Sequence, residues 1–476
     1  MQKIVPFLPP PLDPLFLPAA LWNRAYQTMV SNDPGARTMI MVLERPDGSA
    51  SRHESRVLGV THAESGLTLR YAERLLKFLL WQKGGCKVSI AGAPEIAAHL
   101  SFIYSPKGER AFDHEFMGEK VYGQPFLVGN VDAADLPEER NTSLPMGRHL
   151  DGCRIGFDIG GSDRKAAAVI DGKVVFSEEV PWDPYFQKDP NYHIEGINDS
   201  LKRAAAHLPR VDAIGGSAAG IYVNNEVRVA SLFRGIPPAV FETDIRRLFF
   251  KLQARWGGVP FEVANDGEVA ALAGSMSLGD NAVLGISMGT SQAGGYVRPG
   301  GEITQWLNEL AFAPVDYRKG APSDEWSGDS GCGVQYFSQQ AVSRLADKAG
   351  FGFPHTMPAP ERLVAVQQAM ASGDARASQV YDSLGSYLGY SIGHYADFYP
   401  LKHVLVMGRV TSGPGGERII RRARDVLASE FPAAASRTRV LMPDEKDKRH
   451  GQAIAAASLP SIRVTAGSHS ALTDSK

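Results

Sequence analysis

Two short turns of glycine and hydroxyl residues could hold phosphate groups. The first, Asp158-Ile159-Gly160-Gly161-Ser162, stands at the end of an apolar strand, and the second, Gly289-Thr290-Ser291, has the same place in a similar unit. Glycine leaves backbone N–H groups open to phosphate oxygens, so two such turns facing each other would hold the phosphates of one nucleotide. Taken alone, a glycine-rich hairpin turn of this kind is usually only a connection between strands. Neither matches a Walker A loop or a dinucleotide-binding fingerprint.

A carboxylate follows another predicted strand, at Asn265-Asp266-Gly267. The strand covers 261–264, and a helix is predicted over 268–274. One interpretation is structural, because Asn and Asp are common helix caps. The other is chemical: a carboxylate at a strand end can accept the proton of a substrate hydroxyl. Phosphoryl transfer needs such a group, together with a metal ion and close alignment of nucleophile and phosphate.

The elements that position these groups form an internal repeat. Strand, small-residue turn and strand follow one another at 154–170 and again at 282–297, which predicts two related half-domains. The segment after 170 continues the first unit as an antiparallel meander through a turn at Asp171-Gly172. Helices, a late strand and a small-residue helix complete the pattern, at 242–256, 267–276, 339–349, 377–399, 403–408, 417–427 and 451–459.

The first 150 residues have a different character. Residues 1–35 are rich in proline and predict an irregular arm on the surface, whereas 36–130 predict an α/β unit. Within that unit a helix at 69–83 is apolar on more than one face, so it needs another surface to cover it. Residues 131–152 are polar and rich in turn formers, which indicates a linker.

Composition excludes several classes of function. The chain has 476 residues and a net charge of -2, so it lacks the positive charge expected of a protein that binds nucleic acid or an anionic membrane. No apolar run approaches the roughly 18 residues of a membrane-spanning helix, and prolines interrupt the apolar N-terminus, so we expect no membrane partner and no export. Three cysteines suit a reducing cytoplasm.

The order of these parts resembles the actin/hexokinase/Hsp70-type ATPase superfamily, and within it the ROK family of bacterial sugar kinases and repressors. The resemblance covers about residues 151–460, close to two thirds of the chain. It implies an α/β protein with a two-lobed actin/hexokinase-like (ribonuclease H-like) kinase core and an additional N-terminal α/β region. The implied divisions are an accessory region at 1–150, a first lobe at 151–270, a second lobe at 271–462 and a flexible tail at 463–476.

The resemblance also implies ligands and roles for individual residues. ATP, Mg²⁺ and a small-molecule sugar or polyol are the implied ligands, and a homodimer is compatible with it. Asp266 matches the catalytic base, and Asp158 matches an aspartate that acts on the metal through water. The matched substrate contacts are Asn265, Glu309 and Gly216. The matched nucleotide and phosphate contacts are Asp158, Gly160, Gly161, Ser162, Gly289, Thr290, Ser291, Gly408, Arg409 and Ser412, although Arg409 could equally be a solvated surface residue.

The departures from the family pattern concern zinc and the acceptor. Phe312 stands where the family has a histidine that binds zinc and sugar, and the zinc cysteines are reduced to Cys332, so we expect no zinc. Val334 stands at a second sugar contact. We therefore expect an acceptor that turns an apolar face towards Phe312 and Val334. The aromatic segment at 182–186 could cover the sugar cleft, or could be a packed surface loop.

These observations favour one function and leave two alternatives. The favoured function is ATP-dependent phosphorylation of a sugar or polyol hydroxyl. A non-enzymatic sugar-sensing regulator or repressor could be built on the same core, and so could a sugar-binding protein that has lost catalysis. The N-terminal region predicts strands rather than a compact three-helix DNA-binding unit, which disfavours the repressor and any nucleic-acid partner.

Overall fold

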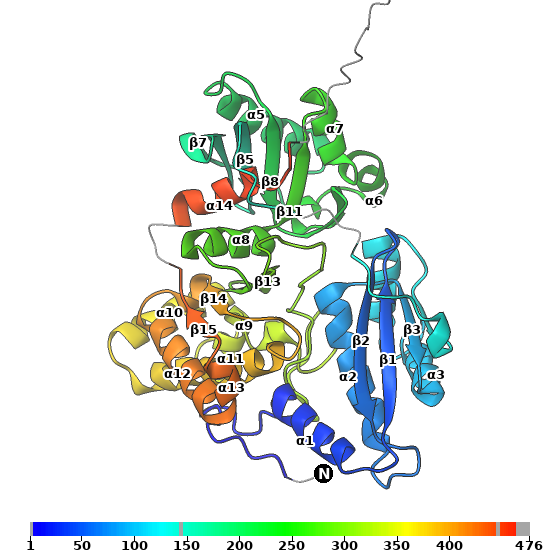
Figure 1. Cartoon of the computed structure of the whole chain (residues 1–476). Helices are drawn as coiled ribbons and strands as arrows, with labels where there is room; N and C mark the ends of the chain where they lie inside the picture. Colours follow the sequence, from blue (N-terminus) through cyan, green and yellow to red (C-terminus); the bar gives the residue numbers. More distant parts are fainter. Residues whose placement is uncertain (1–2, 142–145, 444–447, 463–476) are drawn as a thin grey trace, which may run out of the picture.

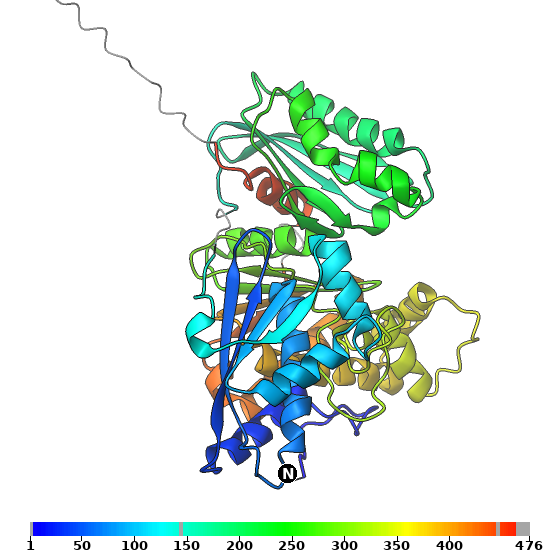
Figure 2. The same cartoon turned by 90° about the vertical axis from the view of Figure 1, so that its right-hand side faces the viewer.

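The computed structural model describes residues 3–141, 146–443 and 448–462, so the tail predicted at 463–476 lies outside the described residues. A first lobe lies above a second lobe, and the N-terminal region lies beside the second lobe (Figure 1). Seen from the side, the N-terminal sheet and helices run along the second lobe and reach up to the first (Figure 2). The two-lobed α/β core with an extra N-terminal α/β region is therefore confirmed.

The first lobe is built on a five-stranded mixed sheet of order β11-β8-β5-β6-β7. Strands β5, β6 and β7 form the predicted antiparallel meander, and β8 and β11 run parallel to β5. Asp171 and Gly172 both have positive φ values in the turn between β6 and β7, as a tight hairpin turn requires. The elements are β5 (Cys153–Ile159), β6 (Asp163–Ile170), β7 (Lys173–Pro181), α5 (Pro190–Ala205), β8 (Ala213–Ala218), β9 (Ile221–Val223), β10 (Glu226–Val229), α6 (Pro238–Val240), α7 (Leu248–Arg255) and β11 (Phe261–Asn265).

The small-residue helix α14 (Lys448–Ala457) packs against the first sheet, although its place in the sequence predicts that it belongs to the second lobe. Gly156 and Gly215 make this approach feasible. A Cβ atom at Gly156 would lie 1.9 Å from the carbonyl oxygen of Ala453, and one at Gly215 would lie 1.7 Å from that of Ala456. The helix backbone therefore rests directly on β5 and β8.

The second lobe repeats the plan on a four-stranded sheet of order β13-β12-β14-β15. Its parallel strands β12, β14 and β15 correspond to β5, β8 and β11, and antiparallel β13 corresponds to β6. Helix α8 lies between the two lobes, against β12, β13 and α14 (Figure 1). The elements are α8 (Asp266–Leu278), β12 (Val283–Met288), β13 (Gln292–Val297), α9 (Gln339–Lys348), α10 (Ala359–Ala371), α11 (Ala375–Tyr395), β14 (His403–Met407), α12 (Pro414–Glu430), α13 (Pro432–Ala435) and β15 (Arg439–Leu441).

The N-terminal region contains the predicted strands and helices in a sheet of order β2-β1-β3-β4. Helix α2 packs on this sheet and on the second lobe, and its side chains Trp81 and Leu80 are fully buried. The short π-helix η1 (Phe116–Tyr122) contacts β9 and β10 of the first lobe. The elements are α1 (Ala19–Ser31), β1 (Arg37–Glu44), β2 (Ala50–Val57), α2 (Gly66–Lys83), β3 (Lys87–Ala91), α3 (Pro94–Ile103), α4 (Ala111–Glu115) and β4 (Leu127–Asn130).

The prediction of an irregular surface arm over 1–35 is wrong in part. Helix α1 occupies 19–31, and its Trp22 and Tyr26 are buried and stacked at 5.7 Å. The segment before it is irregular, with several turns, and its carboxylate Asp13 is buried among Arg318, Lys348 and Tyr387. Apolar residues at i and i+4 give α1 a buried face, and this face ties it to the body of the protein.

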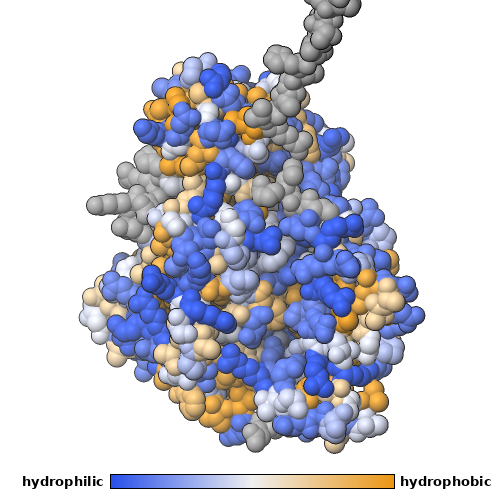
Figure 3. Space-filling model, in the orientation of Figure 1, coloured by the Kyte–Doolittle hydropathy of each residue, from blue (hydrophilic) through white to orange (hydrophobic). Residues whose placement is uncertain are grey.

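The surface carries apolar residues in small groups. The face in Figure 3 is largely hydrophilic, with apolar side chains scattered over it. Within the described residues, none of the helices is both long and apolar enough to span a lipid bilayer.

Candidate active site

Asn265 and Asp266 lie where β11 ends and α8 begins, between the two lobes. The Asn265 side chain accepts a hydrogen bond from the Gly267 N–H at 2.8 Å and donates one to the Gly220 carbonyl at 2.7 Å. Asn265 is therefore the helix cap, and the same bonds fix its amide beside the cleft. Asp266 also accepts from the Gly267 N–H, at 2.9 Å. Both interpretations of this motif are compatible with the geometry.

Two cavities of different size meet the chain at Asn265 and Asp266, since Asp266 lines one and its neighbour Asn265 lines the other. The larger, of about 710 Å³, is lined by Asp266, the small residues of α8, and Gly408, Arg409 and Ser412. The smaller, of about 40 Å³, is lined by Asn265 and Glu309 together with Tyr222 and Trp306. The residues matched to the nucleotide loop thus face one cavity, and two residues matched to substrate binding face the other. The smaller cavity has room for a few water molecules.

The first glycine turn places Asp158 beside the large cavity. The Asp158 carboxylate accepts a hydrogen bond from the Ser217 hydroxyl at 2.6 Å, and Gln452, which lines the cavity, donates to Ser217 at 3.1 Å. The ammonium of Lys165 lies 3.9 Å from the Asp158 carboxylate. The turn closes through the Gly160 N–H, which donates to the Asp163 carbonyl at 3.0 Å.

The aromatic segment at 182–186 covers this first turn and not the acceptor side. The Trp182 indole donates to the Gly160 carbonyl at 2.8 Å, and the Trp182 N–H donates to the Ser162 carbonyl. A Cβ atom at Gly161 would lie 1.9 Å from the Tyr185 hydroxyl oxygen. Glycine at 161 is therefore required by close packing, while Ser162 stays exposed.

The second glycine turn lies next to the nucleotide loop. The Gly289 N–H closes the turn on the Ser291 carbonyl at 2.9 Å, and the Gly289 carbonyl accepts from the N–H of Gln339, the first residue of α9. Thr290 and Ser291 are exposed. Gly408 has a φ of 99°, and a Cβ atom there would lie 2.4 Å from the Met288 carbonyl oxygen. This contact holds the loop that carries Arg409 and Ser412 against the end of β12.

Glu309 lines the small cavity together with Asn265. Its own N–H and that of Asn308 donate to the carbonyls of Trp81 and Gln82 in the last turn of α2, both at 2.9 Å. Asn308 has a φ of 47°, in the left-handed region, and its side chain bonds to Glu268 and to the Tyr399 hydroxyl. Among the described residues, the Glu309 carboxylate has no hydrogen-bond partner.

Three carboxylates in this cleft have raised pKa values. Burial and the neighbouring charge of Asp158 raise the pKa of Asp266 to about 6. Burial and the charge of Asp266 raise the pKa of Glu309 to about 8. Burial also raises the pKa of Asp158, although the hydrogen bond from Ser217 opposes that shift. Such shifts are typical of functional sites, because a cleft that holds uncompensated negative charge favours a proton or a cation.

The donor set around Asp158 fits magnesium held largely by other ligands. Two like-charged, half-buried carboxylates, Asp158 and Asp266, supply the charge that a divalent cation would neutralise. Magnesium keeps several waters and uses one or two carboxylates with substrate phosphates. No group of three His, Cys, Asp or Glu side chains in the described part of the chain is arranged to hold a metal ion by itself. Contact through water, as predicted for Asp158, suits this arrangement.

Gly216 and Phe312, for which the sequence predicted roles near the acceptor, both pack against aromatic rings. Gly216 lies buried in β8 under the ring of Phe157, where a Cβ atom would be 2.2 Å from a ring carbon, so it is a packing residue of the sheet. Phe312 stacks on Trp81 at 4.3 Å and packs among the rings of Phe112 and Phe116. Neither Phe312 nor Val334 lines the two cavities, so an apolar wall facing the acceptor stays a prediction.

The position of the family zinc site is occupied by other interactions. Burial raises the pKa of the Cys332 thiol to about 12, so it stays neutral beside Asp329. The Ser327 hydroxyl and backbone N–H both donate to Asp324 at 2.7 Å. The expectation that the protein needs no zinc remains a prediction.

Sequence reasoning missed several residues of the site. Ser217, Gln452 and Lys165 surround Asp158, but their types are common and they lie far apart in the chain. Asn308 could have been found, since Asn is enriched at positions with positive φ. Trp81 could not, because its contact with the Glu309 N–H depends on how the N-terminal region docks.

Comparisons with known proteins connect this geometry to one fold. No family model matches the sequence, and no curated protein does. Among solved structures, the chain is similar to a ROK hexokinase from Thermus thermophilus (TM-score 0.51, 20% identity, covering 64% of this chain and 96% of that one). It is also similar to a ROK family transcriptional regulator described as a homolog of the E. coli MLC protein (TM-score 0.50, 18% identity, covering 65% and 79%). The core of this chain therefore has the two-lobed, actin/hexokinase-like fold of the ROK family.

Proposed function

We propose that the protein transfers the terminal phosphate of ATP to a hydroxyl of a sugar or polyol. The observation that carries this proposal is the place of Asp266, which lines the large cavity together with Gly408, Arg409 and Ser412. Its chain neighbour Asn265 lines the small cavity together with Glu309. A base between donor and acceptor can take the proton of the attacking hydroxyl as the phosphoryl group is transferred.

Each side of the site has its own task. Gly160 and Gly289 use their N–H groups inside the turns, so the phosphate contacts would fall to Gly161, Ser162, Thr290 and Ser291. Asn265 and Glu309 would bind the acceptor hydroxyls, which suits the unpartnered Glu309 carboxylate. Magnesium, when bound beside Asp158, would neutralise phosphate charge.

The lobes would move during turnover. The small cavity of about 40 Å³ is walled by Tyr222 and Asn225 of the first lobe and by Trp306 of the second. A sugar would enter only when these walls move apart, and closure around it would exclude water, so that the phosphate reaches the acceptor rather than water.

A regulator on the same core is the second candidate, and the similarity to a ROK transcriptional regulator is the observation that favours it. The large cavity beside Asp266 supports the kinase, because a sugar sensor needs only the acceptor side. A coupled ADP-release assay across a panel of sugars and polyols tests the proposal. We expect acceptor-dependent ADP release at pH 7.5 or above, and release that is equal with and without every acceptor would contradict it.

A further inference from the structure

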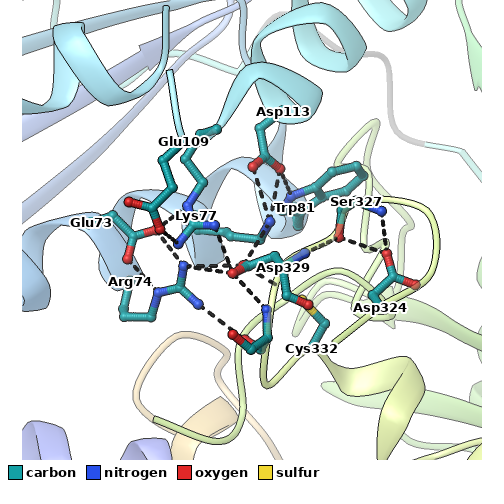
Figure 4. Close-up of polar contacts among 12 residues, drawn as sticks. Glu73, Arg74, Lys77, Trp81, Glu109, Asp113, Asp324, Ser327, Asp329 and Cys332 are labelled. Carbon is teal, nitrogen blue, oxygen red and sulfur yellow. Dashed lines mark hydrogen bonds and ion pairs between the residues drawn. The ribbon is translucent and has the colours of Figure 1, made fainter. Parts of the chain in front are cut away.

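A buried cluster of charges joins the N-terminal region to the second lobe. The Lys77 ammonium, fully buried on α2, lies 3.0 Å from Asp113 of α4 and 3.0 Å from Asp329 in the loop at 324–332. Figure 4 shows Lys77 between these two carboxylates, with Trp81 one turn further along α2. Lys77 thus bridges two elements that are distant in sequence.

The cluster is balanced in charge. Arg74 and Arg110 also contact Asp329, at 3.1 and 2.7 Å, and both pair with Glu73. Three cations, Lys77, Arg74 and Arg110, therefore face three anions, which are Glu73, Asp113 and Asp329. Opposite charges hold the pKa of Asp329 well below its ordinary value. Removing one member of such a buried cluster leaves its partner charged and unpaired, which is strongly destabilising.

The same helix holds the acceptor side of the site. Trp81 donates from its indole to Asp113 at 2.7 Å, so Lys77 and Trp81 share one partner. The carbonyls of Trp81 and Gln82 accept the N–H groups of Glu309 and Asn308. Carbonyl groups in the last turn of a helix lack hydrogen-bond donors within the helix, and here the N–H groups of Asn308 and Glu309 are those donors. The Phe312 ring, three residues beyond Glu309, stacks on Trp81.

We propose that Lys77 is a positioning residue for Glu309. Lys77 fixes α2 against Asp113 and Asp329, and the last turn of α2 in turn fixes the backbone of Asn308 and Glu309. The N-terminal region is by this route part of the acceptor site rather than a separate attachment. The inference rests on the proposed function for the role of Glu309 in binding the acceptor, but the placement of the Glu309 backbone can be tested without any substrate.

The experiment compares two disruptive variants with a matched control in the full chain. Lys77→Met removes the bridging charge, and Asp329→Asn is milder because it retains size and one hydrogen-bonding oxygen. Asp13→Asn is the control, because Asp13 is equally buried and paired with Arg318 and Lys348 but contacts neither α2 nor the 308–312 segment. A stability effect alone would appear in all three variants.

The first measurement is amide hydrogen exchange of the segment containing Asn308 and Glu309, well below the unfolding temperature. We expect about tenfold faster exchange there in Lys77→Met and a smaller increase in Asp329→Asn, with a change of less than about twofold in Asp13→Asn. Unchanged exchange in both test variants, or an equal increase in the control, would overturn the inference. Should Lys77→Met fail to fold, Asp329→Asn decides by the same criteria.

The second measurement uses the acceptor identified by the ADP-release assay. We expect the KM for the acceptor to rise about tenfold in the test variants while the KM for ATP changes less than about twofold, because misplacing a binding group weakens only its own ligand. Equal changes in both constants would count against positioning. If the wild-type protein phosphorylates no acceptor, the proposed function fails, and hydrogen exchange still decides whether Lys77 places Glu309.

Discussion

Asp266 carries a negative charge where a negative charge is costly. It is half-buried at the start of α8, and the neighbouring charge of Asp158 adds to the effect of burial, so its pKa rises to about 6. A carboxylate with that pKa is a stronger base than a solvated one and is still ionised at neutral pH. The same shift means that ionised Asp266 reduces the stability of the folded protein as pH rises through about 6.

The Asp266→Asn variant should separate catalysis from stability. We expect turnover to fall by a factor of about 10² or more, since the general base is lost, while the affinity for ATP is retained. The unfolding temperature at pH 8 should be unchanged or higher, because a buried charge is removed. Steady-state kinetics and thermal unfolding measure the two effects.

Asp374→Asn is the matched control for that substitution. Asp374 caps α11 by accepting from the Arg376 N–H, and Asn can make the same bond. This control should leave turnover unchanged. Near-normal turnover in Asp266→Asn would contradict the catalytic assignment of Asp266.

The pH dependence of kcat/KM provides an independent check. Asp266 must be deprotonated to act as a base, so kcat/KM should rise with pH through about 6 and be about tenfold lower at pH 5 than at its plateau. Asp158→Asn removes the neighbouring charge, so in that variant the rising limb should shift to lower pH, although the rate itself falls. A rising limb at the same pH in both proteins would show that another group titrates.

At the scale of elements, helix α14 packs on the first-lobe sheet through direct backbone contacts, which are possible because Gly156 and Gly215 have no side chain. Gly156→Ala should lower the free energy of unfolding by about 1–3 kcal/mol, because the new Cβ atom would lie 1.9 Å from the Ala453 carbonyl oxygen and the helix must move away. Urea denaturation measures the change. Gly66→Ala is the control, since nothing lies within 4 Å of the place that its Cβ atom would take and Ala favours the helix. Equal stability of the two variants would contradict this account of α14.

The sequence predicted the elements that repeat and missed those that depend on docking. The strand–turn–strand units were found because apolar runs end at glycine and hydroxyl residues, and each unit contains its own signal. Helix α1 was missed because prolines before residue 18 dominate the composition, although Trp22 and Tyr26 have helical spacing.

For the candidate site, too, the sequence predicted some residues and missed the contacts of others. Asp266, Asn265 and Glu309 were found by their order along the chain. The structure brings Asn265 and Glu309 to the small cavity and Asp266 to the large one. The direction of Phe312 could not be predicted, because it depends on Trp81, which is more than 200 residues away and joins it only in the folded protein. Lys77 gave one unused signal, because Glu73, Arg74 and Lys77 place charges at helical spacing on a helix that is otherwise largely apolar.

At the scale of the whole molecule, the described interactions leave no set of ligands for zinc where the family has them. Phe312 stacks on Trp81, Ser327 bonds to Asp324, and Cys332 stays protonated. We expect protein refolded in the presence of a chelator to have the same unfolding temperature and to contain no stoichiometric zinc by elemental analysis. Stoichiometric zinc, lost together with stability on chelation, would contradict this prediction.

The full chain should also lack appreciable affinity for duplex DNA. Its net charge is -2, and its N-terminal region is an α/β unit that packs on the second lobe. Fluorescence anisotropy at increasing salt concentration measures this. Salt-sensitive binding at about micromolar concentration or tighter would favour the regulator over the kinase.

The contact of α14 with the first sheet has a consequence for synthesis on the ribosome. All five strands of that sheet have been made once residue 265 is added, but the helix that covers one of its faces is made only near residue 457. Nearly 200 residues, including every strand of the second-lobe sheet, are translated before α14 can cover this face. Domains generally fold in order as they emerge, and exposed apolar faces on partly made chains invite aggregation. A nascent chain of this protein therefore has a long interval in which a chaperone can bind the first sheet, at the place that α14 later takes.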